Sequence, residues 1–262
     1  MIDKGGCLHG SRLVFLGLRN VMQDRNKTSA SMSGQESREL RSFGRRRGRA
    51  LSPRQQGLLQ DVLPEVQLDF ATPAPTPLTS LFKAPTCEVW LEIGFGGAEH
   101  LLWQAQNNPT AGLIGCEPFE EGVVKALSAI DQNALSNIRL HPDDARDILR
   151  WLPATSIDRA FVLFPDPWPK RRHMKRRLVN TGLLGGLARV MRPGAELRIA
   201  TDIGDYLRTI LIAFREQQAL SWTCKGPAQW RQRPADWPPT RYEQKAGREG
   251  RRCYYLSFVR GE

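Results

Sequence analysis

Apolar and polar positions alternate in two rhythms from residue 87 onward. Short, mostly apolar runs are typical of buried strands, and longer segments with apolar positions three or four residues apart are typical of amphipathic helices. The predicted strands are 87–94, 111–118, 137–144, 157–167 and 195–202. The predicted helices are 97–107, 120–134, 145–152, 176–191 and 204–219. This βαβα order predicts an α/β fold with a doubly wound, mostly parallel sheet.

Two further apolar runs, 221–225 and 252–260, have the pattern of strands near the end of the chain. We expect them to form an antiparallel pair at one edge of the sheet, which brings the sheet to seven strands. No internal repeat of fixed period interrupts this order. The pattern therefore favours one large α/β domain over a repeat architecture.

The residues before the first strand have a different pattern. Residues 52–66 are predicted to form a helix, with Ser52 as N-cap and Pro53 at the first helical position. Residues 71–85 contain four prolines, which cannot continue a helix, so they are expected to form an ordered strap.

These patterns divide the chain into three predicted parts. Residues 1–31 show no sustained periodicity, so we expect disorder or an upstream extension of the reading frame, with Met22 or Met32 as the alternative start. The three parts are a basic, disordered extension (1–50), a helix with a proline-rich strap (51–86) and the main domain (87–262).

Composition narrows the class of protein. The chain has 262 residues, 40% hydrophobic and 25% charged, and no apolar run approaches the 18 or so residues of a transmembrane helix. Its five cysteines are scattered without CxxC spacing, which favours free thiols in a reducing cytoplasm. Neither the cysteines nor the four histidines have metal-ligand spacing, so no metal is expected.

The net charge of +11 is segregated along the chain. Residues 1–50 carry +7 and residues 225–262 carry +5, whereas residues 51–224 carry −1 in spite of six Lys/Arg within 170–177. Three basic runs on an otherwise acidic core favour a polyanionic partner. The last run is interleaved with Trp230, Trp237 and Tyr242, which suits phosphate contacts combined with stacking on exposed RNA bases.

A glycine-rich turn follows the first predicted strand. Gly94, Gly96 and Gly97 allow a sharp turn and a close approach of the backbone to a ligand. The dinucleotide fingerprint GxGxxG fails here because position 99 is Glu, which would repel a pyrophosphate. Glu117 follows Gly94 by 23 residues, near the spacing expected of an acid that binds a ribose. A nucleoside cofactor without a pyrophosphate is therefore predicted.

Four acids, Glu92, Glu117, Asp144 and Asp166, lie at or just after the carboxyl ends of successive strands. Ligands of open α/β sheets bind at that edge. An acid-rich pocket suits a cofactor that carries hydroxyls, an amino group and positive charge, so S-adenosylmethionine fits better than NAD. From spacing alone, Asp144 is equally suited to cap the next helix or to accept from an adenine amino group.

In chain order, LEIGFGG, GCEPF, DDA, FPDPWPKRRHMKRR, ATD and TRYEQKAGREG resemble the bacterial tRNA (guanine-N7-)-methyltransferase family, across roughly residues 42 to 260. The glycine loop is shared by many methyltransferases, whereas the FPDPW and TRYE segments are specific to this family. The resemblance implies a Rossmann-like methyltransferase fold and methylation of guanosine 46 in the variable region of tRNA. Residues 1–31 lie outside it.

The resemblance also implies roles for individual residues. It assigns contact with S-adenosylmethionine to Glu92, Glu117, Asp144 and Asp166, and catalysis to Asp166. The residues that it implies for the RNA substrate are Lys170, Asp202, Thr240, Arg241, Tyr242 and Glu243. Ala98 departs from the glycine common at that point of the family's loop, and we expect its methyl group to narrow the room for the cofactor without abolishing binding.

Guanine N7 has an in-plane lone pair and no proton, so methylation requires alignment and charge compensation more than a strong base. Asp166 would either offset the positive charge that passes to the ring or accept from guanine N1 and N2, and the sequence leaves both open. Two functions from other classes also stay open: an NAD(P)-dependent oxidoreductase, and a non-catalytic RNA-binding protein. The fold alone does not exclude a methyltransferase for another RNA base. The sequence predicts no oligomeric state.

Overall fold

The computed structural model describes Gly44 and residues 46–262, all of which belong to one compact unit of the chain. The predictions of a disordered extension over residues 1–31, and of an alternative start, lie outside the described residues. Residues 41–43 and 45 of the basic run 41–49 lie outside them as well.

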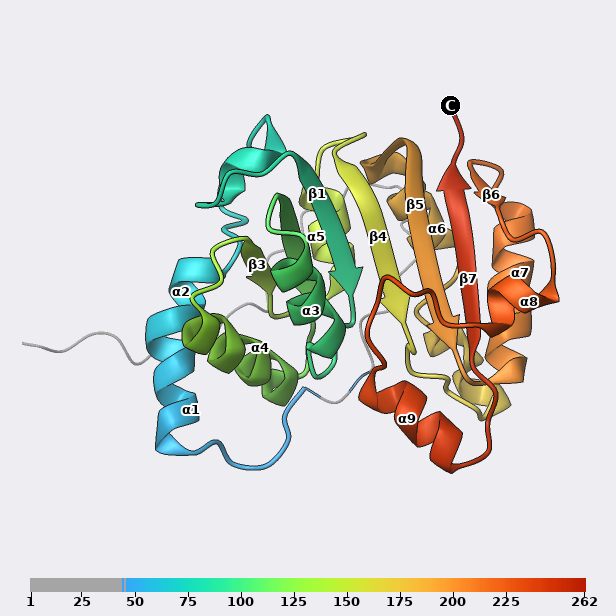
Figure 1. The fold of residues 1–262 in the computed structure, drawn as a ribbon, viewed down its shortest axis with the longest axis horizontal. Helices are drawn as coiled ribbons and strands as arrows, with labels where there is room; N and C mark the ends of the chain where they lie inside the picture. Colours follow the sequence, from blue (N-terminus) through green and yellow to red (C-terminus); the bar gives the residue numbers. More distant parts are fainter. Residues whose placement is uncertain (1–43, 45) are drawn as a thin grey trace, which may run out of the picture. The chain divides into compact units, whose positions relative to one another are not determined.

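Seven strands of the described residues form one sheet in the order β3-β2-β1-β4-β5-β7-β6 (Figure 1). β1 to β5 are parallel to one another, and β7 pairs antiparallel with both β5 and β6. The strands are β1 (Glu88–Ile93), β2 (Ala111–Cys116), β3 (Ile138–His141), β4 (Ile157–Leu163), β5 (Met191–Thr201), β6 (Leu220–Trp222) and β7 (Tyr254–Arg260). This topology confirms the predicted doubly wound sheet and its antiparallel pair.

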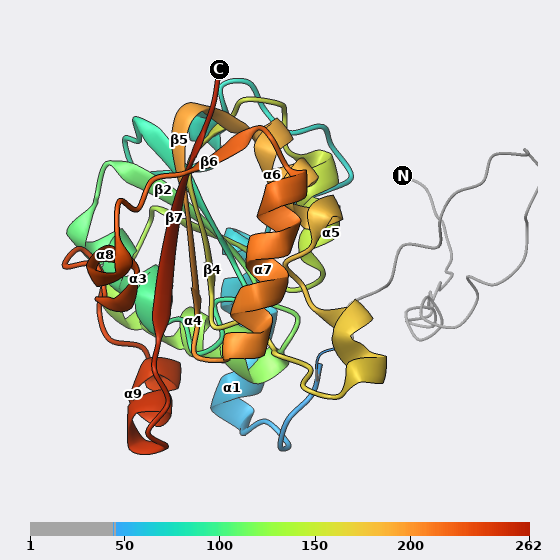
Figure 2. The ribbon, with the colours of Figure 1, turned by 90° about the vertical axis from the view of Figure 1, so that its right-hand side faces the viewer.

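Helices cover both faces of the sheet, as the end-on view in Figure 2 shows. One hydrophobic cluster packs α5 (Ala145–Trp151), α6 (Thr181–Val190) and α7 (Gly204–Glu216) against one face. A second cluster packs α3 (Glu99–Asn107) and α4 (Glu120–Asn133) against the other. Two short helices, α8 (Pro227–Arg231) and α9 (Arg241–Arg248), lie between β6 and β7 in the chain and were not predicted.

The predicted helix over 52–66 is present in three pieces: α1 (Pro53–Gly57), the π-helical turn η1 (Leu58–Val62) and α2 (Leu63–Val66). Ser52 caps it as predicted, in a capping box with Gln55. The π-helical turn lies just before Pro64. Because proline has no backbone N–H, the helix lacks one hydrogen bond there, and the wider turn accommodates that gap.

The strap that follows is packed onto the sheet. Just before the strap, Leu68 N donates to the carbonyl of Leu140 on β3 at 3.0 Å, and the strap itself includes the 3-10 turn η2 (Leu78–Leu81). The ring of Phe82 lies so close to Gly112 of β2 that a Cβ there would be 2.3 Å from it. The strap therefore shares the main hydrophobic core, and the predicted boundaries at 51 and 87 stay predictions.

Three predicted boundaries are wrong by four residues or more, and one of them is the start of the strand expected over 195–202, which begins at Met191. The helix expected over 176–191 is interrupted: the 3-10 turn η3 (Arg171–Arg176) precedes an extended residue, and α6 begins only after Asn180, whose side chain accepts from Leu183 N at 3.0 Å. The strand expected over 157–167 ends at Leu163, because Phe164 adopts a left-handed conformation with φ of 50°.

Gly122, in the first turn of α4, packs directly against the glycine loop after β1. A Cβ at this position would lie 2.2 Å from the carbonyl oxygen of Gly96 and 3.2 Å from Glu117 Cγ. A methyl group at Gly122 would therefore fit only if the backbone of the loop or of helix α4 moved. The close approach of α4 thus sets where the loop can lie.

We expect Gly122→Ala to lower the free energy of unfolding by about 1 to 3 kcal/mol, because the new methyl group overpacks a backbone contact. Urea denaturation measures the change. Gly185→Ala is the matched control, since its Cβ would meet nothing nearer than 3.7 Å within helix α6, and it should be neutral or slightly stabilising. Equal stability of Gly122→Ala and the wild type would contradict the packing described.

Candidate active site

The loop after β1 is built from left-handed residues. Gly94 and Gly96 have φ of 76° and 56°, and Ala98 has φ of 67° although it carries a Cβ. The Gly94 N–H donates to the Cys116 carbonyl at 2.7 Å, which ties the loop to β2. Because a left-handed residue favours glycine, the loop gives a conformational reason for glycine at position 98. The Ala98 methyl group is fully buried in the hydrophobic cluster that packs α3 and α4 against the sheet. That it narrows the room for the cofactor stays a prediction.

Glu117 joins this loop to the next one. Its Oε2 accepts from Gly96 N at 2.7 Å and its Oε1 accepts from Phe119 N at 2.9 Å, and the residue is 8% exposed. Burial raises the pKa of its carboxyl against the effect of the two hydrogen bonds, and the negative charge of Asp166 raises it further. Each oxygen keeps a lone pair that a hydroxyl of a ligand could use.

Glu92, on β1, lies deeper than expected. It is 3% exposed, and its Oε2 is 2.7 Å from Nδ1 of His100, a residue of α3 that is itself buried. His100 Nε2 is 3.1 Å from Gln104 Nε2, which also donates to the Asp236 carbonyl at 2.9 Å. The carboxylate is thus held within a buried polar chain, and its contact with a cofactor stays a prediction. The His100/Gln104 spacing of four, one face of a helix, was the signal available in the sequence.

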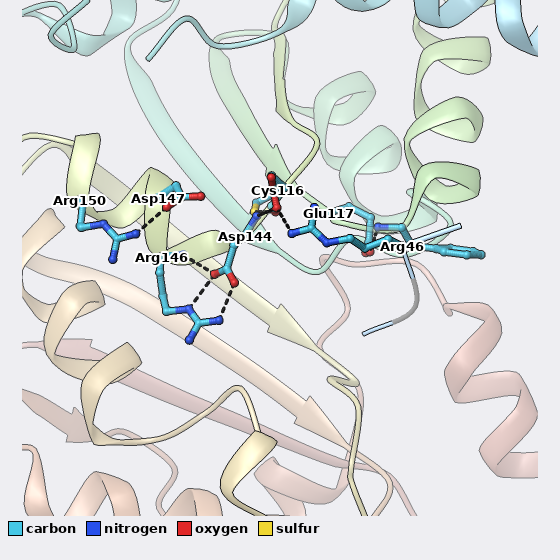
Figure 3. Close-up of polar contacts among 9 residues, drawn as sticks. Arg46, Cys116, Glu117, Asp144, Arg146, Asp147 and Arg150 are labelled. Atoms are coloured by element: carbon cyan, nitrogen blue, oxygen red, sulfur yellow. Dashed lines mark hydrogen bonds and ion pairs between the residues drawn. The ribbon is translucent and has the colours of Figure 1, made fainter. Parts of the chain in front are cut away.

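Asp144 caps α5, one of the two roles that its spacing allowed. Its Oδ1 accepts from Arg146 N at 2.9 Å, and its carboxylate also pairs with the Arg146 guanidinium, 2.8 Å from Nε and 2.5 Å from Nη2 (Figure 3). Arg46 pairs with Asp143, and the same view shows Arg46 beside Glu117. A cation of the first basic run is therefore engaged at the carboxyl end of the sheet.

The segment after β4 carries Asp166. Its backbone is left-handed on both sides, at Phe164 and at Trp168, with φ of 50° and 42°. Asp166 is open to solvent, yet the surrounding protein desolvates its carboxyl enough to raise the pKa. Trp168 is half-buried, with its ring 5.0 Å from Arg176 Cζ, and Lys170 is exposed.

Helix α9 brings the Thr240 to Glu243 segment to the glycine loop. The Thr240 hydroxyl caps the helix by accepting from Glu243 N at 3.3 Å, and Arg241 is 3.6 Å from Glu99. The Tyr242 ring lies over Gly96, where a Cβ would be 3.0 Å from it. Burial raises the pKa of Tyr242, and the charges of Glu117 and Asp166 act in the same direction.

The two acids that the resemblance assigns to the RNA substrate, Asp202 and Glu243, are each paired with an arginine. Asp202 Oδ2 is 2.8 Å from Arg251 Nε. Glu243 Oε1 accepts from the Tyr255 hydroxyl at 2.7 Å and from Arg233 Nε at 3.1 Å. Burial and the Glu243 hydrogen bond raise the pKa of Tyr255. A cavity of about 570 Å³ opens beside them, and its lining includes Arg231, Arg233, Glu243, Arg251, Arg252 and Tyr255.

The structure therefore divides the predicted site residues into two groups. Glu117, Asp166, Arg241 and Tyr242 gather around the glycine loop, at the lower end of the sheet in Figure 1. Glu92, Asp144, Asp202 and Glu243 each have a protein partner, Thr240 is a helix cap, and Lys170 is exposed at the start of η3. Within residues 44 and 46–262, no helix is long and apolar enough to cross a membrane, and no cluster of potential ligands suits a metal ion.

Comparison with known proteins identifies the class. A sequence family described as "Putative methyltransferase" matches residues 86–256. Together with the fold and its acid-lined edge, this match defines the chain as a methyltransferase.

Three curated relatives, all named tRNA (guanine-N(7)-)-methyltransferase, specify the family further. The protein of Brucella melitensis is 49% identical over 218 residues, which cover 83% of this chain and 94% of that protein. The proteins of Rhizobium meliloti (48% identity, 83% and 94% covered) and Rhodospirillum rubrum (47%, 85% and 88%) are similarly related. The chain belongs to the tRNA (guanine-N(7)-)-methyltransferase family. The solved 16S rRNA methyltransferase KamB is a more distant match, at a TM-score of 0.49 and 14% identity over 73% of this chain and 96% of KamB.

We expect Tyr255→Phe to lower the free energy of unfolding by about 1 to 3 kcal/mol, because Glu243 loses a donor in a partly buried, charge-assisted hydrogen bond. Thermal or urea denaturation measures the change. Tyr254→Phe removes the neighbouring hydroxyl, from a ring that stacks on Trp230, and is the matched control. Equal losses in the two variants would show that the bond to Glu243 adds nothing to stability.

Proposed function

We propose that this chain transfers a methyl group from S-adenosylmethionine to N7 of guanosine 46 in tRNA. The observation that carries the proposal is the meeting of Glu117, Asp166 and Tyr242, from two loops and helix α9, around the glycine turn. The names of the relatives support the tRNA substrate, and the family-specific segments FPDPW and TRYE support the position. A tRNA substrate also implies a cytoplasmic location.

The carboxylates at this edge of the sheet fit the proposed cofactor. Desolvation by the surrounding protein raises the pKa values of the buried Glu117 and of the exposed Asp166, and a bound sulfonium would offset the mutual repulsion of their charges. S-adenosylmethionine supplies, when bound, an electrophilic methyl group on that cationic sulfur. We assign its binding to Glu92, Glu117, Asp144 and Asp166, with Glu117 placed to accept from hydroxyls beside the loop.

Asp166 is the proposed catalytic residue. As the bond from sulfur to the methyl carbon breaks and the bond from N7 forms, one positive charge passes to the guanine ring, and no proton needs to be removed. A carboxylate fixed beside the ring stabilises that charge, or holds the base by accepting from N1 and N2. Either role requires that Asp166 be ionised.

The remaining proposed residues bind the RNA. Tyr242 presents a ring above the glycine loop on which a turned-out guanine could stack, and Lys170 offers an exposed cation to a phosphate. We include Asp202, Thr240, Arg241 and Glu243 in the same surface. The arginines that pair with Asp202 and Glu243 line the adjacent cavity, where they could also meet phosphates.

The substrate is tested with two tRNA transcripts that differ only in guanosine or adenosine at position 46. We expect methyl transfer to the first alone, with 7-methylguanosine identified by mass spectrometry. Asp166→Asn should lower kcat by about 10²-fold or more, the size expected from loss of one electrostatic group at a reaction centre. Label in both transcripts would indicate another base. Label in neither, with the cofactor bound, would indicate another RNA target or a binding role.

The pKa shifts predict how cofactor affinity depends on pH. Raised pKa values mean that Glu117 and Asp166 hold their protons to a higher pH than free carboxyls do. Because a cation favours their ionised forms, binding of S-adenosylmethionine should release protons, and its affinity should fall as the pH drops from about 7 toward about 5. In the free protein the sign is opposite: these groups stabilise the fold at low pH, and that stability is lost as the pH rises through the raised values.

Isothermal titration in two buffers of different ionisation enthalpy counts the released protons. S-adenosylhomocysteine lacks the sulfonium charge, so its affinity should depend less on pH than that of S-adenosylmethionine. Glu117→Gln should remove part of the pH dependence seen with S-adenosylmethionine. An affinity for S-adenosylmethionine that stays flat or rises toward about pH 5 would exclude these two carboxylates as the groups that face the cation.

A further inference from the structure

Arg177, the last cation of the run 170–177, differs from its neighbours in being buried. Lys170, Arg171 and Arg172 are exposed, whereas Arg177 is 2% exposed. A buried guanidinium is kept only where its donors are satisfied, and it cannot reach a phosphate of a bound RNA. This cation therefore has a purpose inside the fold.

Its guanidinium bridges the Asp166 segment and helix α7. Nε donates to the Pro167 carbonyl at 2.9 Å, one residue after Asp166. On the other side Nη1 donates to the Asp205 carbonyl at 3.3 Å and to the Thr209 hydroxyl, and Nη2 pairs with the Asp205 carboxylate. Four of its five N–H donors are thus in use.

The ring of Tyr206 forms the floor of this bridge. It is fully buried, and Arg177 Cζ lies 5.0 Å from its centre. The Tyr206 hydroxyl accepts from Val179 N at 2.9 Å, so the chain just beyond Arg177 is fixed to the same helix. The guanidinium is therefore held by α7 independently of the Asp166 segment.

The Asp166 segment needs such an external support. It has left-handed, non-glycine residues on both sides of Asp166, a conformation that persists only when the surroundings impose it. Its three prolines have no N–H with which to form hydrogen bonds of their own. At the near end Phe164 N donates to the Ala200 carbonyl at 2.8 Å, and at the far end Arg177 binds Pro167.

We propose that Arg177 is a positioning residue that holds Asp166 in its reactive place, and that it is not one of the cations that bind RNA phosphates. The inference rests on the proposed function, because it takes Asp166 to be the catalytic residue. The geometry requires the planar, forked N–H donors of the Arg177 guanidinium. A lysine at this position cannot reach Pro167, Asp205 and Thr209 together.

The test compares Arg177→Lys and Arg177→Met with the exposed Arg172→Met. We expect both Arg177 variants to lower kcat by about 10- to 100-fold, the loss associated with a displacement of a catalytic group near 1 Å. KM for tRNA and the salt dependence of tRNA affinity should stay as in the wild type. Arg172→Met should show the opposite division, a weaker affinity for tRNA with a salt slope reduced by about one. A matching loss of affinity and salt slope in Arg177→Met, with kcat retained, would overturn the proposal.

Hydrogen exchange followed by mass spectrometry gives a readout that does not depend on turnover. The peptide over residues 164–170 should exchange faster in Arg177→Met than in the wild type, and in Arg172→Met it should not. Unchanged exchange in Arg177→Met would show that Arg177 does not hold this segment. If the wild type itself methylates no tRNA, the proposed function fails, while the exchange result still decides whether Arg177 supports the segment.

Removal of its partners keeps the test available if the Arg177 variants do not fold. Asp205→Ala and Thr209→Val each delete a contact on α7 and leave Arg177 in place, and the Asp205 side chain is 61% exposed, so that its loss leaves no cavity. Each should lower kcat by about 3- to 10-fold and speed exchange over 164–170, and the double variant should exceed either. Wild-type kcat and exchange in the double variant would overturn the proposal.

Discussion

The carboxylate of Glu117 is the contact on which the arrangement of the site depends. It accepts from the backbone of the glycine loop with one oxygen and from the start of the next loop with the other, so it fixes two strand ends to each other. Gly122 then brings α4 against the same loop with no room for a methyl group. A loop held from both sides in this way gives α9 a fixed surface, and Tyr242 rests on it. The acid that we assign to the cofactor is thus also a structural member of the site.

The division of positive charge is a second result of the packing. In the sequence the basic runs looked equivalent, because each cation contributes the same formal charge. In the structure Arg46 pairs with Asp143, Arg177 with Asp205, Arg233 with Glu243 and Arg251 with Asp202. Only part of each run is left to attract a polyanion, and Lys170 to Arg172 remain exposed. The net charge of +11 already counts the paired acids, so the pairing changes where the positive charge is available to RNA and leaves its sum unchanged.

The sequence predicted those features that depend on local pattern. Strand and helix order follow from periodicity, Ser52 and Asp144 from capping chemistry, and the gathering of Glu117 and Asp166 from the rule that parallel strands end at one edge. It could not predict that Glu92 would turn to His100, or that Arg177 would be buried, because these depend on which side chains the tertiary fold brings together. The interruption before α6 was missed because the basic residues there fit a helix as well as a turn. The capping role of Thr240 was missed because α9, the helix that it caps, was not predicted.

The position of β7 has a consequence for how the chain reaches this structure. β6 comes earlier in the sequence, but its place in the sheet exists only through β7, which lies between it and β5 (Figure 1). While the chain is being synthesised, β5 therefore keeps an open edge until residues 254–260 have left the ribosome, and the bond from Tyr255 of β7 to Glu243 of α9 forms only then. Pairing across so long a stretch of chain is slow to form, and an unpaired strand edge invites association with other chains. The surface proposed to receive tRNA is therefore completed only after β7 has joined the sheet that supports it.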